Sequence, residues 1–508
     1  MHVNGNPLID VTDVQDRTLI RRVSLARLCT MRTPRFTENK FALAVAGLLL
    51  LATAHGGAAP TLDEEDNEFL DDLQWRTFGY FWETTNAVNG LTPDRFPTKS
   101  FSSIAAVGFA LTAYPIGVEH AWITREQAAE RTLTTLNFFA NAPQGDAPVG
   151  MSGHKGFFYH FLELDTGVRY RNNELSTIDT ALLMAGVLFA AEYFDSDSPV
   201  EAKIRTLGNT LYRNVQWDWM EQASGLISHG WKPEVGALQN SYMGYNEAML
   251  LYILALGSPT HPIENRAWQN YTSTYTWDHF YGFEMIQFEP LFGHQYSHVW
   301  IDFRGIHDPY TQARGLDYFE NSVRATRSQQ AYAITNPRGW QDYGENVWGL
   351  TACDGPANTT RLVGGEDREF FTYSARGASS IRVRDDGTIA PTAAGGSISF
   401  APDICIPTLR HMKEHYGTAL YGKYGFVDCF NPTFTFADAK LQHGTIVEGK
   451  GWFDTDYLGI DQGPILTMIE NYRSDFVWNL MRKNLAIRKG LQSAGFTGGW
   501  LDKAAGTR

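Results

Sequence analysis

The feature of this sequence that most limits its fold is an alternation between two kinds of helical segment. Segments 63–82 and 124–140 place apolar residues three and four positions apart, as a helix with one buried face requires. Segments 102–113, 176–194 and 245–256 are apolar on nearly every face, and a helix of that kind is buried on all sides. Such an alternation is what two concentric layers of helices would produce.

The alternation predicts an all-α fold and a single domain over residues 59–508. Further helices are expected at 199–215, 317–334, 402–416 and 462–482. Hydrophobic residues make up 43% of the chain, which can therefore bury a large core. An α-solenoid is the weaker alternative, because the segments show no self-similarity at a fixed period.

The first 58 residues are expected to be a signal peptide region, with Met31 as the true start. Basic residues precede an apolar run at 41–54, and small residues at 52–58 would supply the cleavage site. The run is too short for a comfortable membrane span. We therefore expect a periplasmic or secreted protein with no integral membrane segment after signal removal.

Charge and cysteine content exclude several classes of partner. The formal charge is −14 and no basic stripe occurs, so nucleic acid is not expected, and a neutral substrate is favoured. Cys353, Cys405 and Cys429 remain after the signal, without a CxxC pair or a Cys/His cluster at metal-ligand spacing. We expect these cysteines in the core, and we expect no metal and no cofactor.

Two long connections, 281–312 and 336–400, are rich in Trp, Tyr, Phe, Gly, Asp and His. Long loops inside a compact domain are usually functional. Aromatic side chains stack on the C–H faces of sugar rings, and carboxylates accept hydrogen bonds from sugar hydroxyls. These loops therefore favour a carbohydrate cleft, although loop aromatics also commonly just pack.

Glycoside hydrolysis needs two carboxyl groups, one of which keeps its proton near neutral pH. Glu247 precedes an apolar helix with no cation nearby, so its charge would be costly if buried. The plain alternative is a first-turn Glu that complements the helix dipole. We favour the functional interpretation.

Two other groups of acidic residues stand where buried helices begin. Glu174 and Asp179 flank the start of one helix, where capping and a dipole role are equally good explanations. Asp454, Asp456 and Asp461 lie among aromatic residues before another helix. One of these three is expected to be functional, and the local sequence does not say which.

A histidine-rich stretch offers a metal site as an alternative. His294, His298 and His307 stand near Asp302 and Asp308, but their spacing matches no zinc signature. Substrate binding or hydrogen bonding within the loop is the expectation for this stretch.

Five segments carry a family resemblance: 173–180, 244–247, 291–298, 300–305 and 459–472. Together they resemble the glycoamylase-like domain of glycoside hydrolase family 144, the bacterial endo-β-1,2-glucanases. The resemblance covers nearly all of the chain after the signal.

The resemblance implies a single (α/α)6 barrel whose long loops form the cleft, and inverting hydrolysis of β-1,2-glucan toward sophorose and sophoro-oligosaccharides. Glu247 matches the general acid. Asp461 is our choice for the general base, with Asp456 in reserve. We expect substrate binding by Glu174, Asp179, Tyr245, His294, Gln295, His298, Trp300, Asp302, Arg304 and Trp452.

Other functions stay open on the sequence. A glucan-binding protein without turnover, a transglycosylase or another β-glucosidase would share these aromatic and acidic residues. We expect the protein to be a monomer. A polysaccharide lyase on the same type of toroid needs cations for an acidic sugar, which the acidic chain does not favour.

Overall fold

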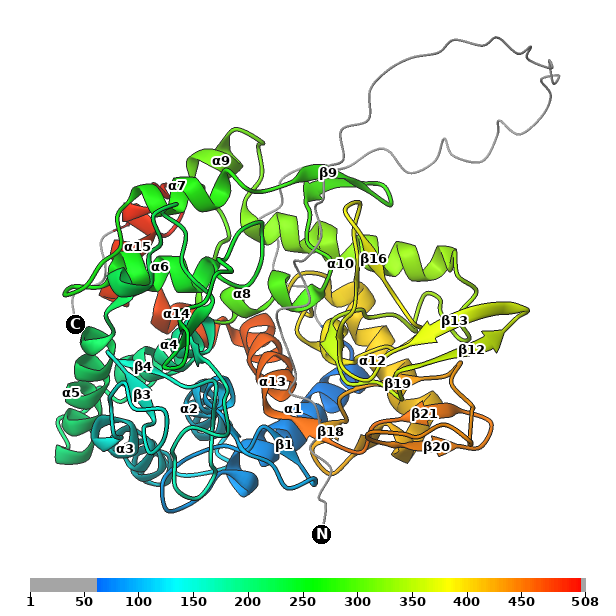
Figure 1. Ribbon diagram of the computed structural model, residues 1–508, viewed down its shortest axis with the longest axis horizontal. Coiled ribbons are helices and arrows are strands. Elements are labelled where there is room, and N and C mark those ends of the chain that lie inside the picture. The colour runs from blue at the N-terminus through cyan, green and yellow to red at the C-terminus, as the bar shows by residue number, and fades with distance from the viewer. Residues whose placement is uncertain (1–61, 504–508) are drawn as a thin grey trace. The chain divides into compact units, whose positions relative to one another are not determined.

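The computed structural model describes residues 62–503 (Figure 1). The chain divides into a unit that ends at Asn67 and a unit from Glu68 to Arg508, and nearly every helix and strand belongs to the second unit. The predicted signal region lies outside the described residues and stays a prediction. Between residues 62 and 503 no helix is both long and apolar enough to cross a membrane.

Four helices are buried almost completely: α2 (Ile104–Glu119), α4 (Thr177–Tyr193), α6 (Met249–Gly257) and α13 (Gly459–Ser474). α2 packs against α4 and α13, and α4 packs against α6. The burial of α2, α4 and α6 confirms the prediction from segments that are apolar on every face.

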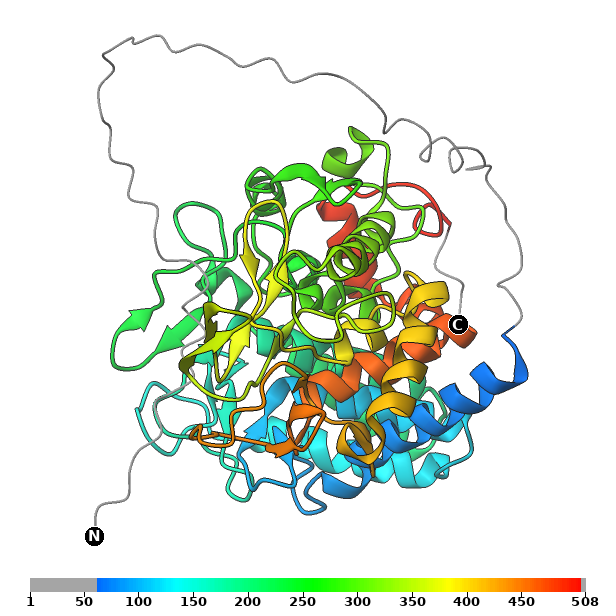
Figure 2. The ribbon, with the colours of Figure 1, turned by 90° about the vertical axis from the view of Figure 1, so that its right-hand side faces the viewer.

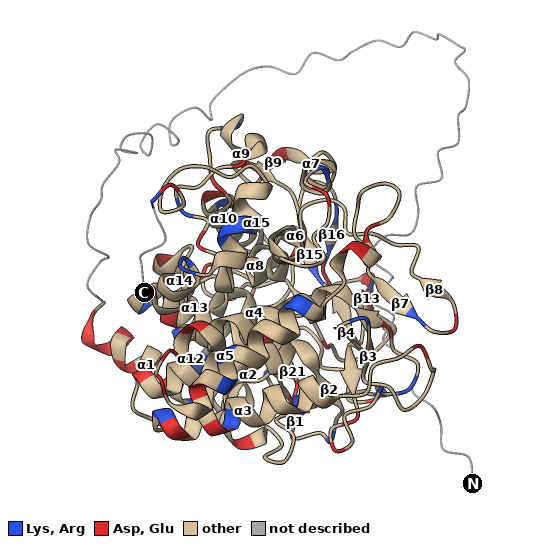
Figure 3. Cartoon of the chain, turned by 90° about the vertical axis from the view of Figure 1, so that its left-hand side faces the viewer, with Lys and Arg blue, Asp and Glu red and all other residues tan. Residues whose placement is uncertain are grey.

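Amphipathic helices cover this inner set: α1 (Glu64–Thr84), α3 (Arg125–Asn141), α5 (Pro199–Asn214), α10 (Tyr318–Thr335), α12 (Pro402–Tyr416) and α15 (Leu485–Ser493). α3 packs on α2 and α5, and α15 packs on α6. Charged residues colour α1, α3 and α5, whereas α2 and α4 carry almost none (Figure 3). A capping box formed by Thr124 and Gln127 begins α3.

Two glycines let α2 and α4 touch backbone to backbone. A Cβ on Gly186 would lie 2.1 Å from the carbonyl oxygen of Gly108, and a Cβ on Gly108 would lie 2.3 Å from that of Leu182. Any larger residue would therefore push the two helices apart. The contact fixes the start of α2 beside the middle of α4.

Short strands end directly before three of the buried helices. β2 (Ser102–Ser103), β6 (Leu175–Ser176) and β22 (Tyr457–Leu458) precede α2, α4 and α13. They pair with β5 (Phe161–Leu162), β7 (Gly230–Lys232) and β1 (Arg95–Phe96). These pairs tie the N-terminal ends of the buried helices to residues distant in the sequence.

The fold is mainly helical, but the expectation of an all-α chain with open loops needs a correction. Residues 62–503 contain ten small sheets of two or three strands. Within the 336–400 connection, β12 (Thr359–Val363) and β13 (Glu366–Phe370) form a hairpin. Its turn, Gly364-Gly365, has φ values of 59° and 88°, which only glycine adopts at little cost.

The helix expected at 462–482 is also different, since it starts earlier and is broken. α13 ends where Asp475 takes a left-handed conformation with φ 55°, and α14 (Phe476–Met481) follows. Figure 2 shows the same elements from a second side.

Candidate active site

Three of the predicted carboxyl groups lie where buried helices begin. Asp179 is in the first turn of α4, where its backbone N–H donates to the capping Ser176 hydroxyl at 3.2 Å. Asp461 is in the first turn of α13, and Glu247 lies two residues before α6. Since α6, α4, α2 and α13 pack in that order, their N-terminal ends are candidates to line one site.

Glu247, Asp179, Glu174 and His160 form what we call the Glu247 group. The His160 ring lies between two carboxylates, with Nδ1 2.7 Å from Glu174 Oε1 and Nε2 3.5 Å from Asp179 Oδ2. Burial alone would lower the pKa of His160, but the two carboxylates raise it to about 9. His160 is therefore a cation at neutral pH.

Glu247 has no such cation beside it. Burial, together with the charge of Asp179, raises the pKa of Glu247 to about 7. Glu174, in contrast, has its pKa lowered to about 2, because its hydrogen bond with His160 outweighs its burial. Glu247 thus holds a proton near neutral pH while a neighbouring carboxyl is ionised.

A second set, the Asp461 group, consists of Asp354, Asp428, Asp454, Asp456, Asp461 and Arg95. All six side chains are buried. The Arg95 guanidinium lies 2.5 Å from Asp354 Oδ2 and 3.8 Å from Asp456 Oδ2. Arg95 also lies 3.3 Å from the buried Asp94, so this one guanidinium faces six carboxyl groups, and they cannot all be ionised at once without a large cost.

Protons offset part of this excess negative charge. Asp428 and Asp461 share a side-chain hydrogen bond, as two carboxyls do when one keeps its proton. Burial raises the pKa of Asp461 to about 8 and that of Asp428 well above its usual range. Asp461 Oδ2 has no hydrogen-bond partner among residues 62–503.

Within the Asp461 group, Asp456 is held differently. Its Oδ1 accepts a hydrogen bond from the backbone N–H of Thr98 at 2.9 Å, and its Oδ2 lies 3.9 Å from His443 Nδ1. Asp456 therefore has one hydrogen-bonded oxygen, and its Oδ2 has no hydrogen-bond partner in the described part of the chain, although Arg95 and His443 lie within 4 Å of it.

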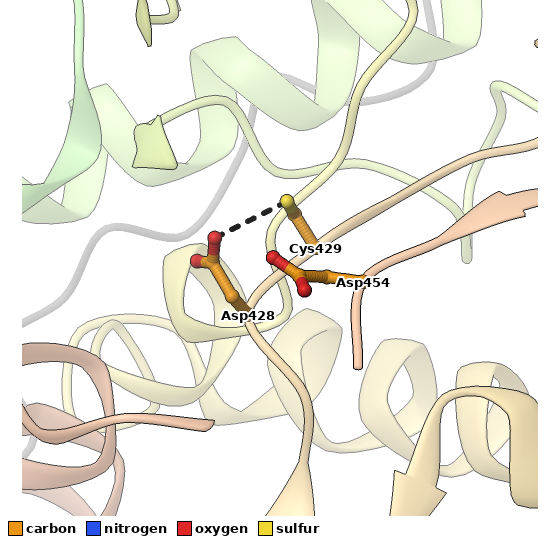
Figure 4. Close-up of side chains that lie close together, drawn as sticks. All are labelled: Asp428, Cys429 and Asp454. Atoms are coloured by element: carbon orange, nitrogen blue, oxygen red, sulfur yellow. Dashed lines mark hydrogen bonds between the residues drawn. The ribbon is translucent and has the colours of Figure 1, made fainter. Parts of the chain in front are cut away.

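One corner of this group could hold a cation. Asp428, Cys429 and Asp454 each offer one ligand atom, and these atoms lie within 4.8 Å of one another (Figure 4). The Cys429 thiol lies 3.1 Å from the carbonyl oxygen of Asp354 and 3.3 Å from Asp428 Oδ2. A metal would have to replace these hydrogen bonds, so protonation accounts for this corner with less rearrangement.

Tyr296 connects the two groups. Burial raises its pKa well above the usual range, and the charges of Asp461, Tyr373, Glu247 and Asp179 add to that effect. Its hydroxyl is thus within electrostatic reach of both predicted catalytic carboxyls. We therefore treat the two groups as parts of one candidate site.

A family match decides the identity of the chain. Residues 239–485 match the glycoamylase family, described as "Putative glucoamylase". A crystal structure from Bacteroides uniformis with the same description is 31% identical, covering 87% of this chain and 100% of that chain with a TM-score of 0.74. The chain belongs to the glycoamylase-like family.

Two further relatives carry more specific names. An exo β-1,2-glucooligosaccharide sophorohydrolase of Parabacteroides distasonis is 28% identical over 469 residues, which cover 86% of this chain. The chain spans 59% of that relative's length. An endo-β-1,2-glucanase from Chitinophaga pinensis, solved with sophorotriose and glucose, is 26% identical, covering 86% of this chain and 99% of its own, with a TM-score of 0.72.

Sequence reasoning missed four of the ten residues in the two groups of this glycoamylase-like protein. His160, Arg95, Asp354 and Asp428 were not among its candidates, because they lie in loops and in two-residue strands. Their signal is weak but present: Asp354 and Asp428 each stand beside a cysteine that is buried here. An aspartate next to a cysteine outside the predicted helices is therefore a sequence signal for a buried carboxyl group.

Several residues predicted to bind substrate instead pack in the core of the glycoamylase-like domain. His294, Gln295, His298 and Trp300 have no exposed surface. The Gln295 amide donates to the Ala393 carbonyl at 2.9 Å, and Trp300 Nε1 donates to Thr112 at 3.0 Å. Tyr245 and Trp452 are also buried. These placements give no support to the binding role predicted for the six residues.

Asp302 and Arg304 belong to an ion-pair network near the other end of α13. Arg304 pairs with Asp302 at 2.8 Å and with Asp475 at 2.9 Å, and Arg482 also pairs with Asp302. The structure therefore does not bring these two residues to the carboxyl groups.

The cysteines follow the expectation of a core role. Cys353, Cys405 and Cys429 are buried and free, so the described part of the chain has no disulfide. The pKa of Cys429 is raised well above its usual range by burial and by its hydrogen bond with Cys353, so its thiol is not a nucleophile at neutral pH.

Proposed function

We propose that this glycoamylase-like protein is an inverting glycoside hydrolase that cleaves β-1,2-glucan. The observation that carries the proposal is the pKa of Glu247, which burial raises to about 7. In the proposed site Glu247 lies on one side and the carboxyl-rich Asp461 group on the other. The relatives named for β-1,2-glucan and sophoro-oligosaccharides supply the linkage.

In this mechanism Glu247 protonates the glycosidic oxygen as the bond breaks. A carboxylate on the far side takes a proton from the water that attacks the anomeric carbon. Asp461 is the proposed base, because it lies in the first turn of α13 and its Oδ2 has no hydrogen-bond partner among residues 62–503. Asp456 is the reserve candidate, and its Arg95 neighbour is the cation nearest to it.

The remaining carboxylates have a proposed binding role. Glu174 and Asp179 are fixed by His160 and can accept hydrogen bonds from sugar hydroxyls. The inverting mechanism expects the acid and the base about 6.5–9.5 Å apart, which leaves room for water.

The proposal includes an architecture and a location. The layered helices support an (α/α)6 barrel, with the strand-bearing connections forming the cleft. Export by a signal within residues 1–58 and action as a monomer complete the proposal.

The test is to incubate the chain from about residue 60 with linear β-1,2-glucan and to resolve the products by size and anomeric form. Sophoro-oligosaccharides released first as the α-anomer are expected. Release of the β-anomer would instead indicate retention of configuration through a covalent glycosyl-enzyme intermediate. Cleavage of soluble starch or β-1,3-glucan alone would move the protein to another linkage.

A further inference from the structure

A cavity of 550 Å³ lies beside the β12–β13 hairpin, and none of its lining residues belongs to the Glu247 group or the Asp461 group. β16 (Val383–Arg384) and the segment at 338–340 complete its walls. Its volume falls within the range of about 300–1,000 Å³ that small-molecule sites occupy. Figure 1 shows β12, β13 and β16 close together at one side of the second unit.

Four arginines line the cavity: Arg338, Arg368, Arg382 and Arg384. Two of them lie over aromatic rings, since the Arg368 guanidinium is 5.2 Å from the Trp340 ring centroid and that of Arg384 is 4.3 Å from the Phe371 ring centroid. A guanidinium stacked in this way has little side-chain entropy left to lose when it donates hydrogen bonds.

Backbone contacts fix the arginines further. Arg368 Nη2 donates to the Arg338 carbonyl at 3.0 Å, and Arg338 Nη1 donates to the Asp385 carbonyl at 3.0 Å. Arg368 Nε is buried and has no partner among the described residues. In residues 62–503 Arg382 has no ion pair, and its side chain is exposed. The wall thus presents donors in fixed places.

Carboxylates in the same wall argue against a site for a simple anion. Asp367 and Glu369 line the cavity and are exposed, so their oxygens can accept hydrogen bonds. Asp385, the third carboxyl, is already bound by Tyr332, Trp340 and Tyr343. Donors on four arginines thus face acceptors on two exposed carboxylates, and a neutral ligand rich in hydroxyl groups can use both.

The cavity is also close to the proposed reaction site. The buried Arg376 guanidinium donates through Nη2 to the Phe371 carbonyl at 3.2 Å and through Nη1 to the Asp354 carbonyl at 2.9 Å. Phe371 is part of the cavity wall, and Asp354 belongs to the Asp461 group. A single side chain therefore bridges the two places.

We propose that this cavity is a distal subsite that binds glucosyl units of the glucan away from the bond that is cleaved. This inference rests on the proposed function, and it gives the enzyme a preference for chains long enough to reach from the Asp461 group to the hairpin. The arginines and the two exposed carboxylates recognise sugar hydroxyls.

The test compares Arg382→Ala, and the double variant Arg338→Ala/Arg382→Ala, with the wild type on two substrates. KM for polymeric β-1,2-glucan is expected to rise about tenfold in the double variant, because hydrogen bonds from a charged group are lost. The kcat/KM for sophorotriose is expected to stay unchanged. Arg327→Ala is the matched control, since Arg327 is a partly exposed arginine that pairs with Asp403 outside the cavity.

Two results would overturn the subsite: unchanged kinetics on the polymer, or equal losses on polymer and trimer. If the wild type cleaves no β-1,2-glucan, the proposed function fails, and retardation of the protein in gels containing β-1,2-glucan takes the place of kinetics. Weaker retardation of the double variant would then still support a glucan site. Equal retardation, or binding of inorganic phosphate that depends on Arg382, would overturn it.

Discussion

The two ends of α13 carry aspartates in opposite situations. At its start, Asp461 faces other carboxyls and has one oxygen without a partner. At its end, about 21 Å away along the axis, Asp475 meets Arg304 at 2.9 Å and Arg482 at 3.6 Å. The C-terminal network has nearly matched charges, so its carboxyls contribute to stability, whereas the N-terminal group stores unfavourable charge. A fold retains such a cost where chemistry or binding requires it.

The largest effect is expected for Glu247→Gln, which tests whether the carboxyl groups at the starts of the buried helices serve catalysis and not stability. The amide keeps the size of the side chain but cannot protonate a leaving oxygen, so kcat on β-1,2-glucan should fall about 10³-fold. The melting temperature should stay unchanged or rise, because a group that is costly to ionise is removed. Glu320→Gln, at an exposed ion pair with Arg324, is the control and should keep full activity. Near wild-type activity in Glu247→Gln would remove Glu247 from the acid role.

Asp461→Asn tests the other proposed catalytic carboxyl and should lower kcat about 10²- to 10³-fold. Its effect on stability depends on pH. The folded state holds the Asp461 proton more tightly than the unfolded state, so the stability present below pH 3.8 is lost as pH rises through about 8. The variant should therefore be more stable than the wild type at pH 8–9 in thermal unfolding. An Asp461→Asn variant that is active but less stable would contradict both the catalytic role and the expected effect on stability. Asp456 would then be the next candidate base, and Asp456→Asn would test it.

The opposite outcome is expected at the C-terminal end of α13. Asp302→Asn removes the carboxylate shared by Arg304 and Arg482, and its side chain is 1% exposed. The free energy of unfolding should fall by about 3 kcal/mol, because two cations lose their partner. The kcat per folded molecule should not change. Urea unfolding and active-site titration of the same sample measure both, and a selective loss of kcat would place Asp302 in the site after all.

The sequence predicted the layers of this fold better than its site. A helix that is buried on all sides can be predicted from its own segment, as α2 and α4 were, because nearly every residue in it must be apolar. Glu247 and Asp461 are predicted from the sequence because a carboxyl at the start of such a helix is locally anomalous, and the structure places both where buried helices begin. The assignment of Asp461 as the base still awaits its test.

The rest depends on contacts between residues distant in the sequence. His160 gains its role only through Glu174 and Asp179, and Arg95 only through Asp354, which follows it by 259 positions. The burial of Gln295 could not be predicted from the sequence either, because its hydrogen-bond partner, Ala393, lies 98 residues away in the chain. The β12–β13 hairpin is different: its Gly-Gly turn is a local signal.

The smallest expected effect is on the pH dependence of the wild-type enzyme, and it sharpens the contrast between the two catalytic carboxyls. Activity requires Glu247 protonated, which is lost as pH rises through about 7, and Asp461 ionised, which is gained as pH rises through about 8. Because the acid has the lower pKa, the active form is a minor species at every pH. The kcat/KM on β-1,2-glucan should therefore follow a narrow bell centred at about pH 7.5. His160→Asn should shift the acidic limb, because Asp179 and Glu174 would lose the cation between them. A broad plateau over about pH 5–8 would instead show that the base ionises well below the acid, and would move that role from Asp461 to another carboxyl of its group.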